Sequence, residues 1–84
     1  MLPRTQPRNF VALKHQRKDG THRTGRALDR DWLNGRRALL IAWSEDGSQT
    51  LVRASDLVYL TYREMLAQER ANKALRRYHG IYSD

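Results

Sequence analysis

The longest uninterrupted apolar run of the chain is Ala-Leu-Leu-Ile-Ala-Trp at residues 38–43. Two dipeptides flank it, Asn34-Gly35 and Asp46-Gly47, and both readily adopt the positive φ angles of a tight hairpin. This pattern predicts three antiparallel strands over residues 26–33, 36–43 and 49–53. A strand without a polar face is usually buried on both sides, so we expect 36–43 to be the central strand, covered on one face by a helix.

Residues 57–60 are apolar and predict either a short fourth strand or a bend. Directly after them, Thr61 and Glu64 have the spacing of a capping box, in which each side chain accepts a hydrogen bond from the other residue's amide. A helix is therefore predicted over residues 62–78, ending before Gly80. Its apolar positions form an incomplete stripe: Tyr62, Met65, Leu66, Ala71, Ala74, Leu75 and Tyr78.

The N-terminal residues 1–25 are predicted to form a basic arm. Pro3 and Pro7 disfavour regular structure at its start. Asn9 is a suitable N-cap for a short helix over residues 10–18, which Phe10 and Leu13 would dock onto the rest of the protein. The predicted organisation is an arm (1–25), a folded domain (26–80) and a tail (81–84).

With 84 residues the chain has room for one domain with a modest core. It has no cysteine, so disulfides and thiolate metal sites play no part. It also lacks an apolar run of the roughly 20 residues that cross a bilayer, and its N-terminus has no apolar segment of a secretory signal. We expect a non-secreted protein, intracellular or virion-associated, that does not contact membranes. The expected fold class is α+β: a small curved antiparallel sheet packed by a C-terminal helix.

One family has a similar order of motifs. Ala27-Leu28-Asp29-Arg30 precedes the Asn34-Gly35 turn, the apolar strand ends at Trp43, and Thr50 to Arg53 and Asp56-Leu57 precede the helix. Over about residues 27–67 this order resembles a chromodomain, and the resemblance implies an SH3-like curved sheet.

Chromodomains read methylated lysine with a cage of aromatic side chains, and the resemblance implies this activity as one candidate. Only Trp43 matches a cage position in this chain. The other two positions fall near His22 and Asp46, neither of which is Phe, Tyr or Trp. If the chain reads peptides, Trp43 should therefore be accessible in a groove.

The net charge of +7 is unevenly distributed. Residues 1–37 contain ten Lys/Arg against three Asp/Glu, residues 38–62 carry a net −2, and residues 63–84 a net +2. Arginine outnumbers lysine 13 to 3, and its planar fork suits bidentate contacts with phosphate. A basic arm beside a nearly neutral core predicts a surface for a polyanion.

The predicted nucleic-acid contacts come from the arm, the first hairpin and the helix end. The residues are Arg4, Arg8, Lys14, Arg17, Lys18, Arg23 and Arg26; Arg30, Trp32, Arg36 and Arg37; Lys73, Arg76 and Arg77. We expect the arginines of the first third of the chain to converge into one continuous cationic face. Aromatic side chains could stack on bases, and Trp32, beside the hairpin turn, is the best placed. The other aromatic candidates are Trp43, Tyr59, Tyr62, Tyr78 and Tyr82.

Other chemistry has little support. His15, His22 and His79 are too scattered for a metal site, no motif places a base beside a nucleophile, and no glycine-rich loop indicates a cofactor. The sequence therefore predicts a non-enzymatic nucleic-acid-binding protein with largely sequence-independent contacts, DNA or RNA being open. Two alternatives are a peptide reader and a phage-type structural or host-interaction protein, either a virion or assembly component or an inhibitor that docks on an acidic protein surface.

Overall fold

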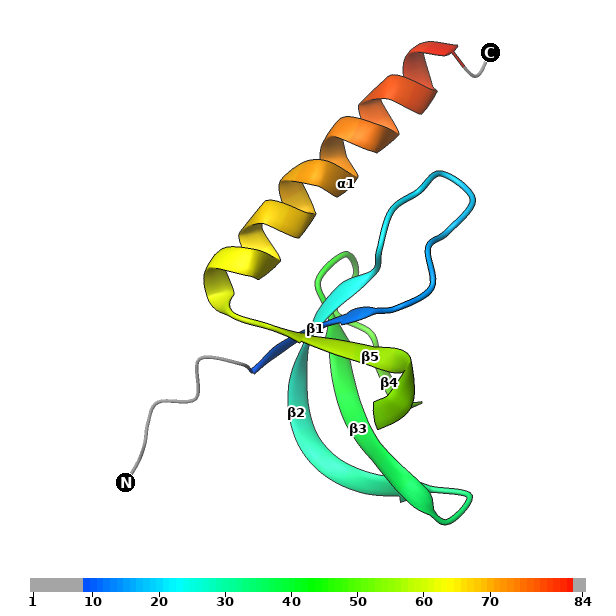
Figure 1. Ribbon diagram of the computed structural model, residues 1–84, viewed down its shortest axis with the longest axis vertical. Coiled ribbons are helices and arrows are strands. Elements are labelled where there is room, and N and C mark those ends of the chain that lie inside the picture. Colours follow the sequence, from blue (N-terminus) through cyan, green and yellow to red (C-terminus); the bar gives the residue numbers. More distant parts are fainter. Residues whose placement is uncertain (1–8, 83–84) are drawn as a thin grey trace.

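The computed structural model describes residues 9–82, with the side chains of residues 9–78. Five antiparallel strands form one sheet, and a long C-terminal helix lies across it (Figure 1). The strands are β1 (Phe10–Leu13), β2 (Thr24–Leu33), β3 (Arg36–Trp43), β4 (Gln49–Arg53) and β5 (Leu57–Leu60). A single 3₁₀ turn, η1 (Ala54–Asp56), precedes β5, and the helix is α1 (Tyr62–Tyr82). The fold class is therefore α+β, as predicted.

The two hairpins are confirmed, and of the two alternatives left open for residues 57–60 the structure has the strand. Asn34 and Gly35 both have positive φ, 53° and 78°, which gives the tight turn between β2 and β3. The connection from β3 to β4 is wider: Gly47 has a φ of 73°, and Asp46 accepts hydrogen bonds from the amide and hydroxyl of Ser48. The bounds of β3, β4 and β5 agree with the predicted ones.

The predicted helix over residues 10–18 is wrong, and the sheet has five strands instead of three or four. Phe10–Leu13 forms β1, which pairs with β2 on one side and β5 on the other. Val11 and Ala12 are buried there. A helix of this length is marginal without tertiary contacts, whereas the strand pairs on both sides, so the tertiary contacts override the local helix signal.

The strand order is β4-β3-β2-β1-β5, so the middle position belongs to β2 and not to β3 as predicted. Pairing registers place alternate residues of each strand on one inner, concave face. The core forms on this face from Val11, Ile41, Trp43 and Leu57, with Leu13, Ala27, Leu39 and Val52 packed against it.

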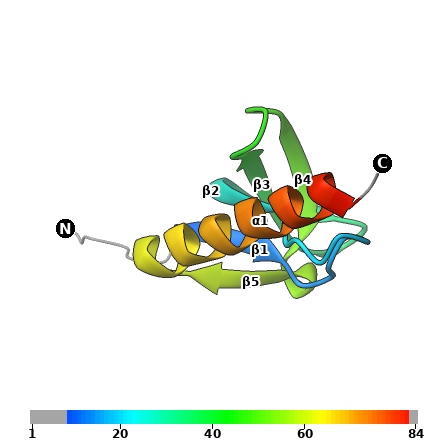
Figure 2. The same cartoon turned by 90° about the horizontal axis from the view of Figure 1, so that it is seen from above.

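The helix packs on the opposite face, mainly against β1, β2 and β5 (Figure 2). Thr61 and Glu64 form the predicted capping box, with N–H···O distances of 3.1 and 2.8 Å. The helix continues to Tyr82, beyond the predicted end at Tyr78. Its buried face holds Met65 and Asn72, whereas several members of the predicted apolar stripe are exposed: Tyr62, Leu66 and Tyr78.

Asn72 fastens the loop of residues 14–23 to the helix. Its Oδ1 accepts a hydrogen bond from the amide of His22 at 3.0 Å, and its Nδ2 donates to the carbonyl of His22 at 2.6 Å. The loop consequently rises beside α1 (Figure 1).

Candidate nucleic-acid interface

The inner face of the sheet changes from apolar to basic along β3. Trp43 and Ile41 are buried in the core, Leu39 is half-buried, and Arg37 is exposed. These four residues alternate along the strand and therefore share the inner face. At the end of the sheet near the Asn34-Gly35 turn, the inner face is therefore open to solvent and has an apolar floor; we call this end the mouth of the sheet.

A bulge in β2 determines which of its side chains reach this mouth. Ala27 lies opposite Ile41 and Arg30 lies opposite Leu39, while Leu28 has no partner on β3. Residues directly opposite each other in an antiparallel pair share a face. Because Leu28 is the extra residue, Arg30 and Trp32 are on the inner face, where uninterrupted alternation from Ala27 would place Asp29 and Asp31.

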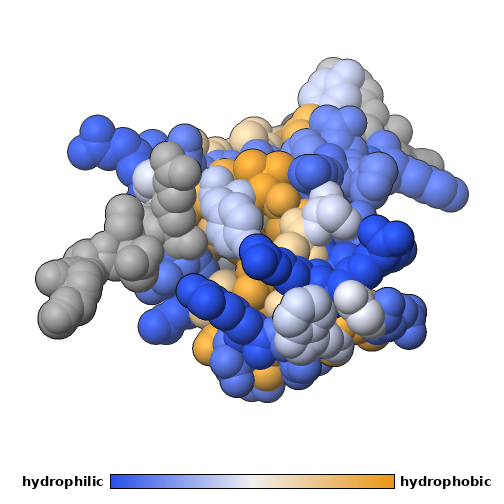
Figure 3. Space-filling model, turned by 60° about the horizontal axis from the view of Figure 1, so that its bottom comes forward, coloured by the Kyte–Doolittle hydropathy of each residue, from blue (hydrophilic) through white to orange (hydrophobic). Residues whose placement is uncertain are grey.

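Two adjoining hollows at this mouth share Arg30, Leu39 and Tyr59 in their walls, and we call them together the mouth groove. One of the two hollows has a volume of about 470 Å³, and Trp32 and Arg37 also line it. Other residues along the groove are Asn9, Ala27, Leu28, Asp29, Asp31, Ala38 and Ala54. Figure 3, which brings the bottom of the Figure 1 view forward, shows an apolar patch framed by hydrophilic side chains.

The two aromatic side chains of the mouth groove, Trp32 and Tyr59, are exposed to solvent. Trp32 is 64% exposed and Tyr59 is 47% exposed. They come from β2 and β5, on opposite sides of β1 in the sheet. Large exposed aromatic surfaces that converge on one hollow are typical of ligand-binding surfaces.

The two arginines of the groove have no carboxylate partner. Within the part of the chain that the structure describes, neither Arg30 nor Arg37 forms an ion pair. Asp29 and Asp31 instead accept hydrogen bonds from the amides of the residues that follow them, at 2.8 and 2.7 Å. The positive charge at the mouth is therefore not neutralised by an ion pair within the described residues.

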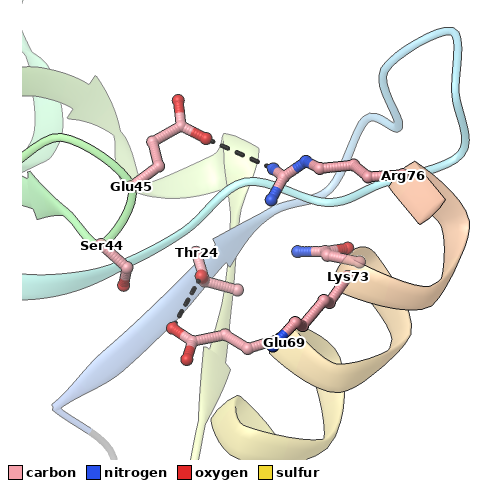
Figure 4. A pocket seen from close by; sticks show the side chains of 7 residues that line it. Thr24, Ser44, Glu45, Glu69, Lys73 and Arg76 are labelled. Carbon is pink, nitrogen blue, oxygen red and sulfur yellow. Dashed lines mark hydrogen bonds and ion pairs between the residues drawn. The ribbon is translucent and has the colours of Figure 1, made fainter. Parts of the chain in front are cut away.

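A second basic cluster lies at the other end of β3. Glu45, in the β3–β4 loop, is 2.6 Å from Arg17 and 3.0 Å from Arg23. It also lies 3.5 Å from Arg76, and Figure 4 shows this pair. Arg23 also lies 3.5 Å from Asp46. We call these five residues the acidic clasp, because two carboxylates hold three arginines from the 14–23 loop and α1.

The two carboxyl groups of the acidic clasp have lowered pKa values. The hydrogen bond from Arg17 lowers the pKa of Glu45 below its ordinary value, and the charges of Arg17 and Arg23 add to this, while burial opposes it. Hydrogen bonds from Ser48 lower the pKa of Asp46. Both carboxyl groups are therefore ionised at neutral pH. The clasp arginines form ion pairs with them and so connect the 14–23 loop and α1 to the β3–β4 loop.

Beside the clasp is a hollow whose polar groups are largely engaged with one another. Glu69 accepts a hydrogen bond from the hydroxyl of Thr24 at 3.2 Å, and Glu45 pairs with Arg76 (Figure 4). Ser44, Asn72 and Lys73 complete the lining. The mixture of charges shows no preference for one class of ligand.

Trp43 is not presented to a ligand. Its side chain is 2% exposed in the core, and the guanidinium of Arg23 lies 4.3 Å from the ring centroid. The peptide-reader hypothesis requires this residue to be accessible in a groove, and here it is a packed core residue.

The structure separates the predicted binding residues, so the expectation of one continuous cationic face is wrong. It brings together Arg30, Trp32 and Arg37 at the mouth, with Arg36 exposed beside the turn. Arg17, Arg23 and Arg76 are held in the acidic clasp at the opposite end of β3. Lys14, Lys18, Arg26, Lys73 and Arg77 are exposed elsewhere, and Arg4 and Arg8 lie outside the described residues.

Sequence reasoning did not select Leu39 or Leu28 as part of the site, and it gave Tyr59 only as one of several aromatic candidates for stacking. Tyr59 is an evident aromatic in the sequence, but its position depends on the pairing of β5 with β1, which the predicted N-terminal helix concealed. The irregular polar pattern of residues 26–33 was the available sign of the bulge at Leu28.

Comparison with known proteins gives no relative: no protein-family model, curated protein or solved structure matches the chain. Among the described residues, no group of three or more His, Cys, Asp or Glu side chains is arranged to hold a metal ion. No helix in residues 9–82 combines the length and apolar character needed to cross a bilayer.

Proposed function

We propose that this protein is a small, non-enzymatic nucleic-acid-binding protein whose binding surface is the mouth groove. The observation that carries the proposal is the convergence of Arg30 and Arg37 with the exposed rings of Trp32 and Tyr59 over an apolar floor. Neither arginine pairs with a carboxylate among the residues that the structure describes. Arginine supplies charge and bidentate hydrogen bonds to phosphate, and aromatic rings supply surfaces for bases.

Charge distribution supports the same proposal. The chain carries +7, and residues 1–37 contain most of the excess. Neutralising phosphates releases counterions, so binding should weaken steeply as salt rises. Because no helix projects base-reading side chains from this groove, contacts should be largely independent of sequence.

The fold supports a finer assignment, which we also propose: an SH3-like curved sheet of the kind that the chromodomain resemblance implies. Five short strands curl around one core, a 3₁₀ turn precedes β5, and a helix follows directly. The burial of Trp43 favours nucleic-acid binding over peptide reading within that fold.

Fluorescence anisotropy with labelled DNA and RNA oligonucleotides at two salt concentrations tests this function. We expect salt-sensitive binding that falls at least about tenfold in the variant R30Q/R37Q, because each lost phosphate contact removes affinity. The matched control is R63Q/R70Q, which removes the same charge from exposed positions of α1. Equal loss in both variants would show that only net charge matters.

The alternative of a virion, assembly or host-interaction component would use the same arginines on an acidic protein surface. Absence of nucleic-acid binding at low salt, together with a protein that co-purifies through Arg30 and Arg37, would favour it. No observation on the described residues favours it over nucleic acid.

A further inference from the structure

We propose that the mouth groove takes unpaired bases, so that the protein prefers single-stranded nucleic acid over duplex. This inference rests on the proposed function and adds the class of ligand. In it, bases stack against Trp32 and Tyr59 while Arg30 and Arg37 hold the neighbouring phosphates.

Sheet geometry places the two rings on the same side. Tyr59 is opposite Val11, and Val11 is opposite Gly25, so the three share the inner face across β5, β1 and β2. Trp32 reaches that face through the bulge at Leu28. Both rings line the 470 Å³ hollow, with Leu39 also in its wall.

The hollow is suited to a planar ligand group such as a base, because two aromatic rings and an apolar side chain line it. A base inside a duplex is stacked on its neighbours and offers only its edge, so it cannot lie against a side chain within a hollow. An unpaired base offers its π-face, and stacking on aromatic side chains is tolerant of sequence. The floor formed by Ala27 and Leu39 is apolar, so contact with it does not select one base; the polar side chains of Asn9, Asp29 and Asp31 are elsewhere in the lining.

The two arginines favour an anion between them, because the aspartates that also line the groove, Asp29 and Asp31, alternate to the other face of β2. Trp32 lies opposite Arg37, and Arg30 lies opposite Leu39, so the two arginines occupy diagonal positions of the same face. Side chains at diagonal positions are near enough to interact, and two like charges there repel each other. A phosphate between them would relieve that repulsion, because neither arginine has a carboxylate partner among the described residues.

Intrinsic fluorescence provides a direct test, since the chain has two tryptophans in opposite environments. Trp32 is 64% exposed and Trp43 is 2% exposed. Titration of the full-length protein with oligo(dT) or oligo(U) should change the emission of Trp32 and saturate. In the variant W32F, where Trp43 is the remaining reporter, the emission should stay constant.

Affinity measurements complete the test. At the same salt we expect oligo(dT) to bind at least about tenfold more tightly than a duplex of equal length. The variants W32L and Y59L should each lose about tenfold for the single strand and little for the duplex, and Y59F should retain binding because it keeps the ring. Tyr78→Leu, on α1 outside the groove, is the control.

The outcomes separate the two proposals. Equal affinity for both nucleic acids, with W32L unchanged and R30Q/R37Q weakened, would overturn the stacking inference and leave the proposed function in place. No binding of any oligonucleotide at low salt would overturn both. Trp32 is exposed and outside the core, so its variants decide the matter even if Y59L fails to fold.

Discussion

Arg30 lies directly opposite Leu39 across the β2–β3 hairpin, although Ala27, three residues earlier, lies opposite Ile41. The two strands advance by different numbers of residues between these pairs, and Leu28 is the residue left over. One extra residue thus places Arg30 and Trp32 on the inner face of β2, whereas Asp29 and Asp31, which also border the mouth groove, alternate to the other face. The site depends on this irregularity as much as on its residue types.

Exchanging Asp29 and Arg30 tests directly whether binding depends on which of the two side chains is on the inner face of β2. The double variant D29R/R30D keeps the net charge but puts a carboxylate on the inner face beside Arg37. We expect oligonucleotide binding to fall more than about tenfold in anisotropy titrations, because a carboxylate repels phosphate and pairs with the remaining arginine. Unchanged binding would show that the overall charge, and not the groove, governs affinity.

Asn72 should be important for stability. The variant N72A removes both hydrogen bonds to the backbone of His22. His22 is partly buried, so leaving its backbone groups without these partners should cost about 1 kcal/mol, the lower end of the range for buried groups, and the urea midpoint should fall accordingly. The exposed helical position Arg70 gives the control R70A, for which we expect little change. Equal effects of the two substitutions would argue against this role for Asn72.

Gly25 should tolerate no side chain. A Cβ at this position would lie 2.6 Å from Ile41 Cγ2 and 2.8 Å from the carbonyl oxygen of Ala42. Overpacking of this kind costs about 1–3 kcal/mol, so G25A should melt at a lower temperature. The comparison variant is G35N, because a Cβ at Gly35 would meet nothing within 4 Å. Any loss of stability there comes from the positive φ, which asparagine tolerates better than most residues, and not from crowding. A wild-type melting temperature for G25A would contradict the close packing of β2 on β3.

The acidic clasp should make stability depend on pH. The pKa of Glu45 is lowered in the folded state, so its pairs stabilise the fold above the ordinary value of 4.5. That contribution is lost as the pH falls through the lowered pKa, because the unfolded chain then binds more protons. The urea midpoint should therefore decrease between pH 7 and pH 3.

The variant E45Q isolates the contribution of Glu45 to this effect. Its urea midpoint should be lower than that of the native chain at pH 7, by the modest amount typical of partly exposed pairs, about 0.2–1 kcal/mol for each. It should also fall less on acidification. Some pH dependence should remain, since hydrogen bonds from Thr21 and Ser48 lower the pKa values of Asp19 and Asp46. An identical decrease in both proteins would show that the clasp does not contribute.

Local signals alone were sufficient for the hairpins, for β3 and β4, and for the start of α1. Asn34-Gly35 and the Thr61–Glu64 capping box each define their own geometry through backbone angles and hydrogen bonds within a few residues. Arg30, Trp32 and Arg37 could be selected for the same reason, since one short hairpin holds all three.

Tertiary structure alone decided where the remaining residues act. Phe10–Leu13 became a strand because β2 and β5, far away in sequence, pair with both its sides. Arg17, Arg23 and Arg76 meet Glu45 through packing of the 14–23 loop on α1, which no local pattern encodes. Neighbouring residues determine short-range geometry such as turns and helix caps. Contacts across the sheet depend instead on which arrangement of the whole chain best buries its apolar side chains and pairs its charges.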